Sequence, residues 1–409
     1  MLAMGCCRSR AAVAHAPESG VDEVPLERPR ILTEREVLEL FDQAEEVHQT
    51  EGGTSGAEFL HTKLPAEHWG ISRAQLQDFA LRVRASLLDR LGEGLGEFSN
   101  MSAKDCKKLG VRYYDDAKFN DPCIGPNMYQ VNEAFIKPQT LKGDPVRNMP
   151  CLSYALWQNG RCGLLCDLFI SHAWSEGVFE FSDAVISAWP DECRGAYICF
   201  LSNPQNLGGL ISTLVKKPTE SPFFRVLLCR PRKMMMVATC NTPIHSRLWC
   251  VYEAHCARQF CIPTFVVGNP ASFCTNARAA RRAESFIRSA VDSKRREAAI
   301  DDAMEQAATE MDIILAGVLH SRYQKARRKA ERATASAMSK LQRALDVRKA
   351  ECSNAQDREA IQNEIYGQAE QINAMICELI VDDQLKRPAT RPVKLTWYRG
   401  QDTLEGIWA

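Results

Sequence analysis

The sequence lacks several features that would place it in a specialised class of protein. It contains no run of about eighteen apolar residues, so we expect no transmembrane helix. Its first residues lack the apolar core of a secretory signal, which argues against secretion. Basic and acidic residues balance at 51 each, so no net field favours a nucleic acid or a membrane as partner. We therefore expect a cytoplasmic protein that binds no nucleic acid.

The 17 cysteines also lack the paired short spacing of a structural zinc site. The closest groups are Cys162 with Cys166, and His255 with Cys250, Cys256 and Cys261. Most of the thiols lie in apolar runs of a chain without a secretory signal. We therefore expect them to be reduced and buried, and we expect no metal site.

The first ten residues, MLAMGCCRSR, leave two interpretations open. If translation began at Met4, Gly5 would open a myristoylation pattern and Cys6 and Cys7 could be palmitoylated. As written, Met1 precedes this pattern and the glycine is not terminal, which favours a disordered, slightly basic start. A membrane is therefore expected as a partner only if Cys6 and Cys7 are acylated.

Composition and periodicity divide the 409 residues into six segments. We expect a disordered N-terminus (1–30), a helical region (31–110), an extended arm rich in proline and aromatic residues (111–162), an α/β domain (163–270), a helical region (277–382) and an irregular tail (383–409). Thr33, with Glu36 three residues later, predicts the start of the first helix. The many aromatic residues of the arm predict that it packs on a neighbouring domain.

The helical region at 277–382 contains no proline before Ile380 and is rich in Ala, Arg, Glu, Lys and Gln, which predicts long helices. Apolar residues are sparse between Tyr323 and Lys349. This part is either a solvated arm or a coiled coil, and the lack of a strict heptad leaves both open.

Within 163–270, short apolar runs alternate with helical patterns. The predicted strands cover 164–170, 196–201, 234–239 and 262–267, and the predicted helices cover 179–189, 221–228 and 246–259. This alternation, with short loops, predicts a parallel sheet joined by crossover helices.

Three stretches of this region carry a family resemblance. They are Asp167-Leu168-Phe169-Ile170-Ser171-His172-Ala173-Trp174, then Ser221-Pro222-Phe223-Phe224, and last Ser246-Arg247-Leu248-Trp249-Cys250-Val251-Tyr252-Glu253. The last contains a Trp-Cys-x-x-Glu pattern. In this order and on these elements the stretches resemble the TIR family, named for Toll/interleukin-1 receptors and plant resistance proteins, and above all its protist members. The resemblance covers about a quarter of the chain.

The resemblance implies a flavodoxin-like, five-stranded parallel sheet and two alternative functions. Many TIR domains cleave NAD at the nicotinamide–ribose bond, which would make this chain an NAD glycohydrolase in signalling, with NAD as substrate and no bound cofactor. Others are non-catalytic signalling scaffolds or adaptors that act by self-association. Either function implies a homo-oligomer, formed through the TIR-like domain or the C-terminal helices.

Glu253 matches the family glutamate that binds the ribose hydroxyls and stabilises the cationic sugar. Its helical neighbours include Trp249, Cys250 and Cys256 and no basic residue, so this carboxylate needs another partner or a function. The alternative is that Glu253 only bonds a backbone amide.

Other candidate residues follow the carboxyl ends of the predicted strands, where a ligand of such a sheet should lie. The candidates for nucleotide binding are Ser171, His172, Trp174, Ser202, Asn203 and Trp249, and Asn241 follows a third strand. Trp174 could stack on a base or cover the sheet edge, and the two serines could donate to a ligand or cap a helix. For His172 an ordinary loop role is favoured over acid–base chemistry, and for Trp249 a core position.

Two further segments are of interest. Residues 203–209 occupy the place of the family's BB loop, which closes over ligand or mediates self-association, and Gly208 and Gly209 would make it mobile. A basic cluster precedes the third strand and could hold a pyrophosphate, although a solvated face is favoured. The cluster consists of Arg225, Arg230, Arg232 and Lys233.

Overall fold

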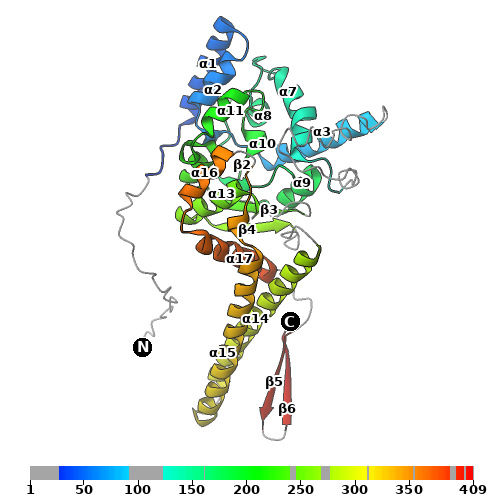
Figure 1. Cartoon of the computed structure of the whole chain (residues 1–409), viewed down its shortest axis with the longest axis vertical. Helices are drawn as coiled ribbons and strands as arrows, with labels where there is room; N and C mark the ends of the chain where they lie inside the picture. Colours follow the sequence, from blue (N-terminus) through cyan, green and yellow to red (C-terminus); the bar gives the residue numbers. More distant parts are fainter. Residues whose placement is uncertain are drawn as a thin grey trace, which may run out of the picture.

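A four-stranded parallel sheet, with helices on both faces, forms the centre of the protein (Figure 1). The computed structural model describes residues 27–91, 123–160, 162–239, 246–268, 277–310, 313–352, 355–386, 393–399 and 402–408. The strands are β1 (Leu168–Ser171), β2 (Ala196–Ile198), β3 (Lys233–Ala238) and β4 (Thr264–Gly268), in the order β2-β1-β3-β4. All three pairings are parallel, which confirms the predicted α/β class.

Alternate residues of the strands point to opposite faces of this sheet, and both faces are buried. Phe169, Tyr197 and Met234 lie on what we call the first face, in one hydrophobic core. Ile170 and Met235 lie on the second face, in another core. Burial of both faces explains why the strands appear in the sequence as continuous apolar runs.

The order in which the chain adds strands to the sheet reverses between β1 and β3. Helix α9 (Val178–Ser187) joins β1 to β2 on the second face, whereas α12 (Pro222–Leu228) and α13 (Leu248–Gln259) pack on the first face. The chain therefore moves outward from β1 to β2 and then crosses back to β3. In open α/β sheets, ligands bind at such a point, beyond the carboxyl ends of the strands.

The N-terminal helices are part of the same body. They are α1 (Glu34–Glu51), α2 (Ser55–Lys63) and α3 (Arg73–Leu91). The predicted start of α1 is confirmed, because Thr33 and Glu36 form a capping box. Phe41 and Leu60 are buried in the core of the first face and Phe79 in that of the second. Between α2 and α3, Ile71 bridges Ala196 and so covers the β2 edge of the sheet.

The described part of the expected extended arm is helical instead. It contains α6 (Met128–Val131), the π-helical turn η2 (Asn132–Ile136), α7 (Lys137–Leu141) and α8 (Tyr154–Asn159). Asn127 caps α6 together with Gln130, but the helices are too short to give a periodic pattern. The aromatic residues Phe135 and Tyr154 are buried, as expected of an arm that packs on its neighbour.

The predicted long helices of the C-terminal third are present. Helices α14 (Ala277–Glu310) and α15 (Ile313–Ala344) lie side by side and project from the body, and α17 (Ala369–Lys386) packs on β4 and α13 (Figure 1). The last helices are α16 (Ala355–Glu364) and α17 (Ala369–Lys386). None of the helices in the part of the chain that the structure describes combines the length and apolar character needed to cross a membrane.

The prediction of an irregular tail is wrong for residues 393–399 and 402–408, which the structure describes. Strands β5 (Val393–Arg399) and β6 (Asp402–Trp408) form an antiparallel hairpin. Alternating Val393, Leu395 and Trp397 form the period-two pattern of a strand, which the prolines of this region obscure.

Candidate active site

Five side chains, four of them predicted, converge at the carboxyl ends of β1 and β2. Ser171 is the last residue of β1, and His172 and Trp174 follow it. Cys199 follows β2 directly, and Glu253 reaches the same place from α13, the helix after β3. The cluster therefore lies at the switch between β1 and β3.

The centre of the cluster is a hydrogen bond between Ser171 and Glu253. The Ser171 hydroxyl donates to Glu253 Oε2 over 2.5 Å, and the two residues are only 1% and 6% exposed. Burial raises the pKa of Glu253 to about 8, while the bond from Ser171 acts in the opposite direction. In this closed arrangement the carboxyl group is therefore mainly protonated at neutral pH.

A second group of contacts surrounds the Cys199 thiol. Its sulfur lies 3.2 Å from His172 Nε2 and accepts a hydrogen bond from Trp174 Nε1 over 3.1 Å. Burial lowers the pKa of His172 to about 3, and burial together with the Glu253 charge raises that of Cys199 to about 12. Thiol and imidazole are therefore both neutral at physiological pH.

Glu176, in the turn between β1 and α9, is a second buried carboxyl group near this cluster. It is 0% exposed, and within the described residues neither carboxylate oxygen accepts a hydrogen bond from a side chain. Burial raises its pKa well above the ordinary range, with the Ala173 backbone amide acting against this shift. Glu176 also raises the pKa of Cys199 through its charge.

The remaining candidates make structural contacts. The Ser202 hydroxyl accepts from the Ile198 amide over 3.0 Å, and Asn203 Oδ1 accepts from the Tyr197 hydroxyl over 2.7 Å. The Trp249 indole donates to Asp357 on α16 over 3.2 Å. Asn241 lies outside the described residues.

These contacts correct the predicted strand at 196–201. The strand ends at Ile198, and α10 (Cys199–Ser202) follows at once, because the Ser202 hydroxyl takes the Ile198 amide that would otherwise continue the ladder. Residues 208–214 form α11 (Gly208–Leu214), so the two glycines begin a helix. In the loop between, Asn206 Nδ2 donates to the Lys137 carbonyl and to Thr140 Oγ1, at 2.9 Å each.

The basic cluster at 225–233 lies before and at the start of β3. It is therefore at the amino end of this strand, whereas the candidate site lies at the carboxyl ends of the strands. Arg225 forms two hydrogen bonds, of 2.8 and 3.0 Å, with the fully buried Glu67, and Lys233 pairs with Glu192. The alternative that this cluster holds a pyrophosphate is therefore not supported by its position.

Sequence reasoning missed Cys199 and Glu176. Glu176 shares its stretch (Ala173–Phe181) with a second acidic residue, Glu180, so the sequence does not single it out, and Cys199 was hidden by the overlong predicted strand. In the part of the chain described, no group of three or more His, Cys, Asp or Glu side chains is arranged to hold a metal ion.

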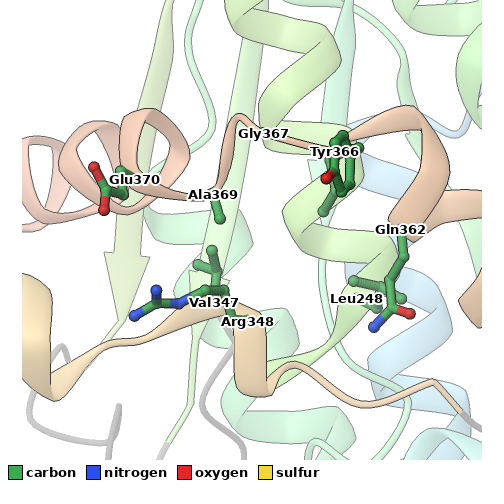
Figure 2. A pocket seen from close by; sticks show the side chains of 9 residues that line it. Leu248, Val347, Arg348, Gln362, Tyr366, Gly367, Ala369 and Glu370 are labelled. Atoms are coloured by element: carbon green, nitrogen blue, oxygen red, sulfur yellow. The ribbon is translucent and has the colours of Figure 1, made fainter.

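A separate cavity of about 470 Å³ lies between α13, α16 and α17. Its charged residues Arg348 and Glu370 lie at one end and Tyr366 and Gln362 at the other (Figure 2). Arg348 is already bonded to Asp346 over 2.7 and 3.1 Å. The cavity contains none of the clustered residues at the strand ends, so it is not part of this site.

Comparisons with protein-family models, with curated proteins and with solved structures found no match to this chain.

Proposed function

We propose that this protein is a TIR-like enzyme that cleaves NAD to nicotinamide and ADP-ribose and acts in cytoplasmic signalling. The observation that carries the proposal is the 2.5 Å hydrogen bond between Ser171 and Glu253 at the switch between β1 and β3. The two residues come from two separate stretches of the family resemblance, 82 positions apart in the sequence.

The topology supports the same proposal. The order β2-β1-β3-β4 corresponds to the first four places of the flavodoxin-like order, 2-1-3-4-5. A fifth strand beside β4 belongs to the proposal, because the described residues place only four strands in this sheet.

Each side chain has a role in the proposed reaction. As the bond between nicotinamide and ribose breaks, its electron pair leaves with nicotinamide and the sugar becomes a cation. Ionised Glu253 stabilises that cation, and Ser171 holds the carboxylate in position. Water then adds to the anomeric carbon and releases a proton. Trp174 stacks on a ring of the dinucleotide, and His172 remains neutral.

We infer from the closed geometry that this form is a resting state. Glu253 is 6% exposed and its pKa is about 8, so little of the required carboxylate exists at neutral pH. Opening of the site admits water, returns the pKa towards its ordinary value and admits NAD. We propose that self-association of the chain stabilises the open state.

The alternative is a non-catalytic TIR-like scaffold that acts by self-association. The contacts that favour it are the mutual bonding of Ser171 with Glu253 and the protein partners of Ser202 and Asn203. In this alternative the polar cluster only holds the strand ends together.

The test is nicotinamide release from NAD by the purified full chain at high concentration, with a crowding agent. Glu253→Gln keeps the size of the side chain and removes its charge, and the exposed Glu359→Gln on α16 is the matched control. Release by wild type and control, with loss of at least a hundredfold in Glu253→Gln, supports the enzyme. No release from folded, self-associated protein would favour the scaffold.

A further inference from the structure

The outer face of α15 carries an excess of positive charge that the composition of the whole chain hides. Helix α15 (Ile313–Ala344) contains eight Lys and Arg residues and one acidic residue, Glu331. Its neighbour α14 contains seven of each kind. The equal totals of 51, from which we expected no nucleic-acid partner, average over this local difference.

Six of these cations lie along one exposed line. At about 100° per residue they fall within an arc of about 120° on the helix, and they extend over about 27 Å. We call them the basic stripe: Lys325, Arg328, Lys329, Arg332, Lys340 and Arg343, all exposed.

The opposite face of α15 fixes the stripe in place. Ala330, Ala337 and Leu341 are buried there, and Thr334 bonds Glu297 of α14. Arg327, at the boundary, pairs with Asp301 of α14 over 3.4 Å and with Glu331 over 3.0 Å. Arg327 is thus neutralised, whereas none of the six in the stripe forms an ion pair with an acidic residue in the described parts of the chain.

The residues between the cations indicate the kind of partner. Ser336 and Ser339 lie within the arc, with Ala333 and Ala335 at its margins, and all four are exposed. Helices that lie in a membrane surface carry large apolar side chains beside their cations, and single-stranded nucleic acids are bound by aromatic side chains. This face has neither, so its chemistry is that of a rigid row of phosphate-binding groups.

We propose that the basic stripe of α15 binds the phosphate backbone of double-stranded nucleic acid without sequence preference. A duplex carries one negative charge per about 1.7 Å of its axis, or about 16 over the length of the stripe. This regular charge along a straight axis matches a straight helix whose cations share one face. The proposal does not rest on NAD cleavage and makes α14 and α15 a docking arm.

The test is fluorescence anisotropy of the full chain with a labelled duplex of about 25 base pairs, between 50 and 200 mM salt. Six phosphate contacts predict an affinity that falls about a thousandfold over this range. Replacement of Arg328, Lys329 and Arg332 by Gln, a good helix former, should lower the slope of log affinity against log salt by about three.

A matched control removes three exposed cations elsewhere, Lys63, Lys142 and Lys216, which also changes the net charge by three. Ser336→Glu places an anion inside the stripe with every cation retained, and it should weaken binding about tenfold. Equal losses in the stripe variant and the control would overturn the proposal. So would duplex binding that does not depend on salt, or binding to vesicles rich in phosphatidylserine but not to the duplex.

Discussion

The cluster of side chains at the ends of β1 and β2 and the basic stripe of α15 differ in the burial of their polar groups. In the cluster, Ser171 and Glu253 are buried and bonded to each other, and burial keeps the carboxyl group neutral. In the stripe, residues such as Arg328 and Arg332 are exposed to solvent. Under our two proposals, the cluster must open before it can act on a ligand, whereas the stripe can bind from the surface without a rearrangement. Burial therefore decides whether a charged residue contributes to stability or to recognition.

The largest effect on stability should come from Arg225, a partly exposed residue whose acidic partner, Glu67, is buried. Arg225→Ala leaves the carboxylate of Glu67, which is 0% exposed, without its partner. Removal of one member of a buried pair costs roughly 3–5 kcal/mol, and we expect the lower end because Arg225 is partly exposed. Urea unfolding measures it. Lys217→Ala, in an exposed pair with Glu220, should cost under about 1 kcal/mol, and equal losses would contradict this comparison.

The next effect depends on pH. The pKa of Glu253 is about 8 in the folded protein and near 4.5 when unfolded, so the folded state retains a proton that the unfolded state releases. The resulting stability is complete below pH 4.5 and is lost as the pH rises to 8, at about 1.4 kcal/mol per unit. Glu253→Gln has no group that titrates at this position, so its free energy of unfolding should not fall with pH for this reason. Between pH 5 and 7 it should therefore gain about 3 kcal/mol relative to wild type. Parallel curves for the two proteins in urea unfolding would show that Glu253 is ionised in the fold.

Loss of one buried hydrogen bond should have a smaller effect. Ser171→Ala removes the donor to Glu253 and should cost about 1–2 kcal/mol, and it should raise the pKa of Glu253 further. Ser182 is a matched control, because it is equally buried but its hydroxyl has no partner among the described residues. Ser182→Ala should change the free energy of unfolding by less than about 0.5 kcal/mol. A similar loss in both variants would mean that the bond contributes nothing.

The smallest effect should come from the stripe. Replacement of Arg328, Lys329 and Arg332 by Gln removes exposed charges without ion pairs, so the unfolding free energy should change by less than about 0.5 kcal/mol. Thermal unfolding in parallel with wild type measures it. A loss above about 1 kcal/mol would show that these side chains support the fold instead of facing a partner.

Periodicity was enough to predict the sheet and the helices that cover it. The strand regions could be found because burial on both faces leaves apolar runs, as in Met234–Ala238. The end of β2 was misplaced, because a side-chain bond from Ser202 decides it, and hydropathy does not record such a bond. The short helices at 128–141 and the hairpin at 393–408 were missed for similar local reasons.

The candidate site was predicted in part. Proximity of Ser171 and Glu253 is consistent with the parallel sheet, because Ser171 ends β1, Glu253 lies on the helix after β3, and the carboxyl ends of parallel strands lie on one side of the sheet. The contact between His172 and Cys199 could not be predicted, because it depends on where β2 ends. The partners of Ser202, Asn203 and Trp249 depend on packing between distant segments, which the local pattern does not contain.

The most direct test of the central claim is the rate of nicotinamide release from NAD between pH 6 and 8.5, for wild type and Glu253→Gln. At low protein concentration, where the closed resting state predominates, Glu253 must lose its proton as the site opens, so the wild-type rate should rise about tenfold per unit below the pKa of about 8 and then level off. Glu253→Gln should be inactive throughout. A wild-type rate independent of pH, or release retained by Glu253→Gln, would contradict the assignment of this site.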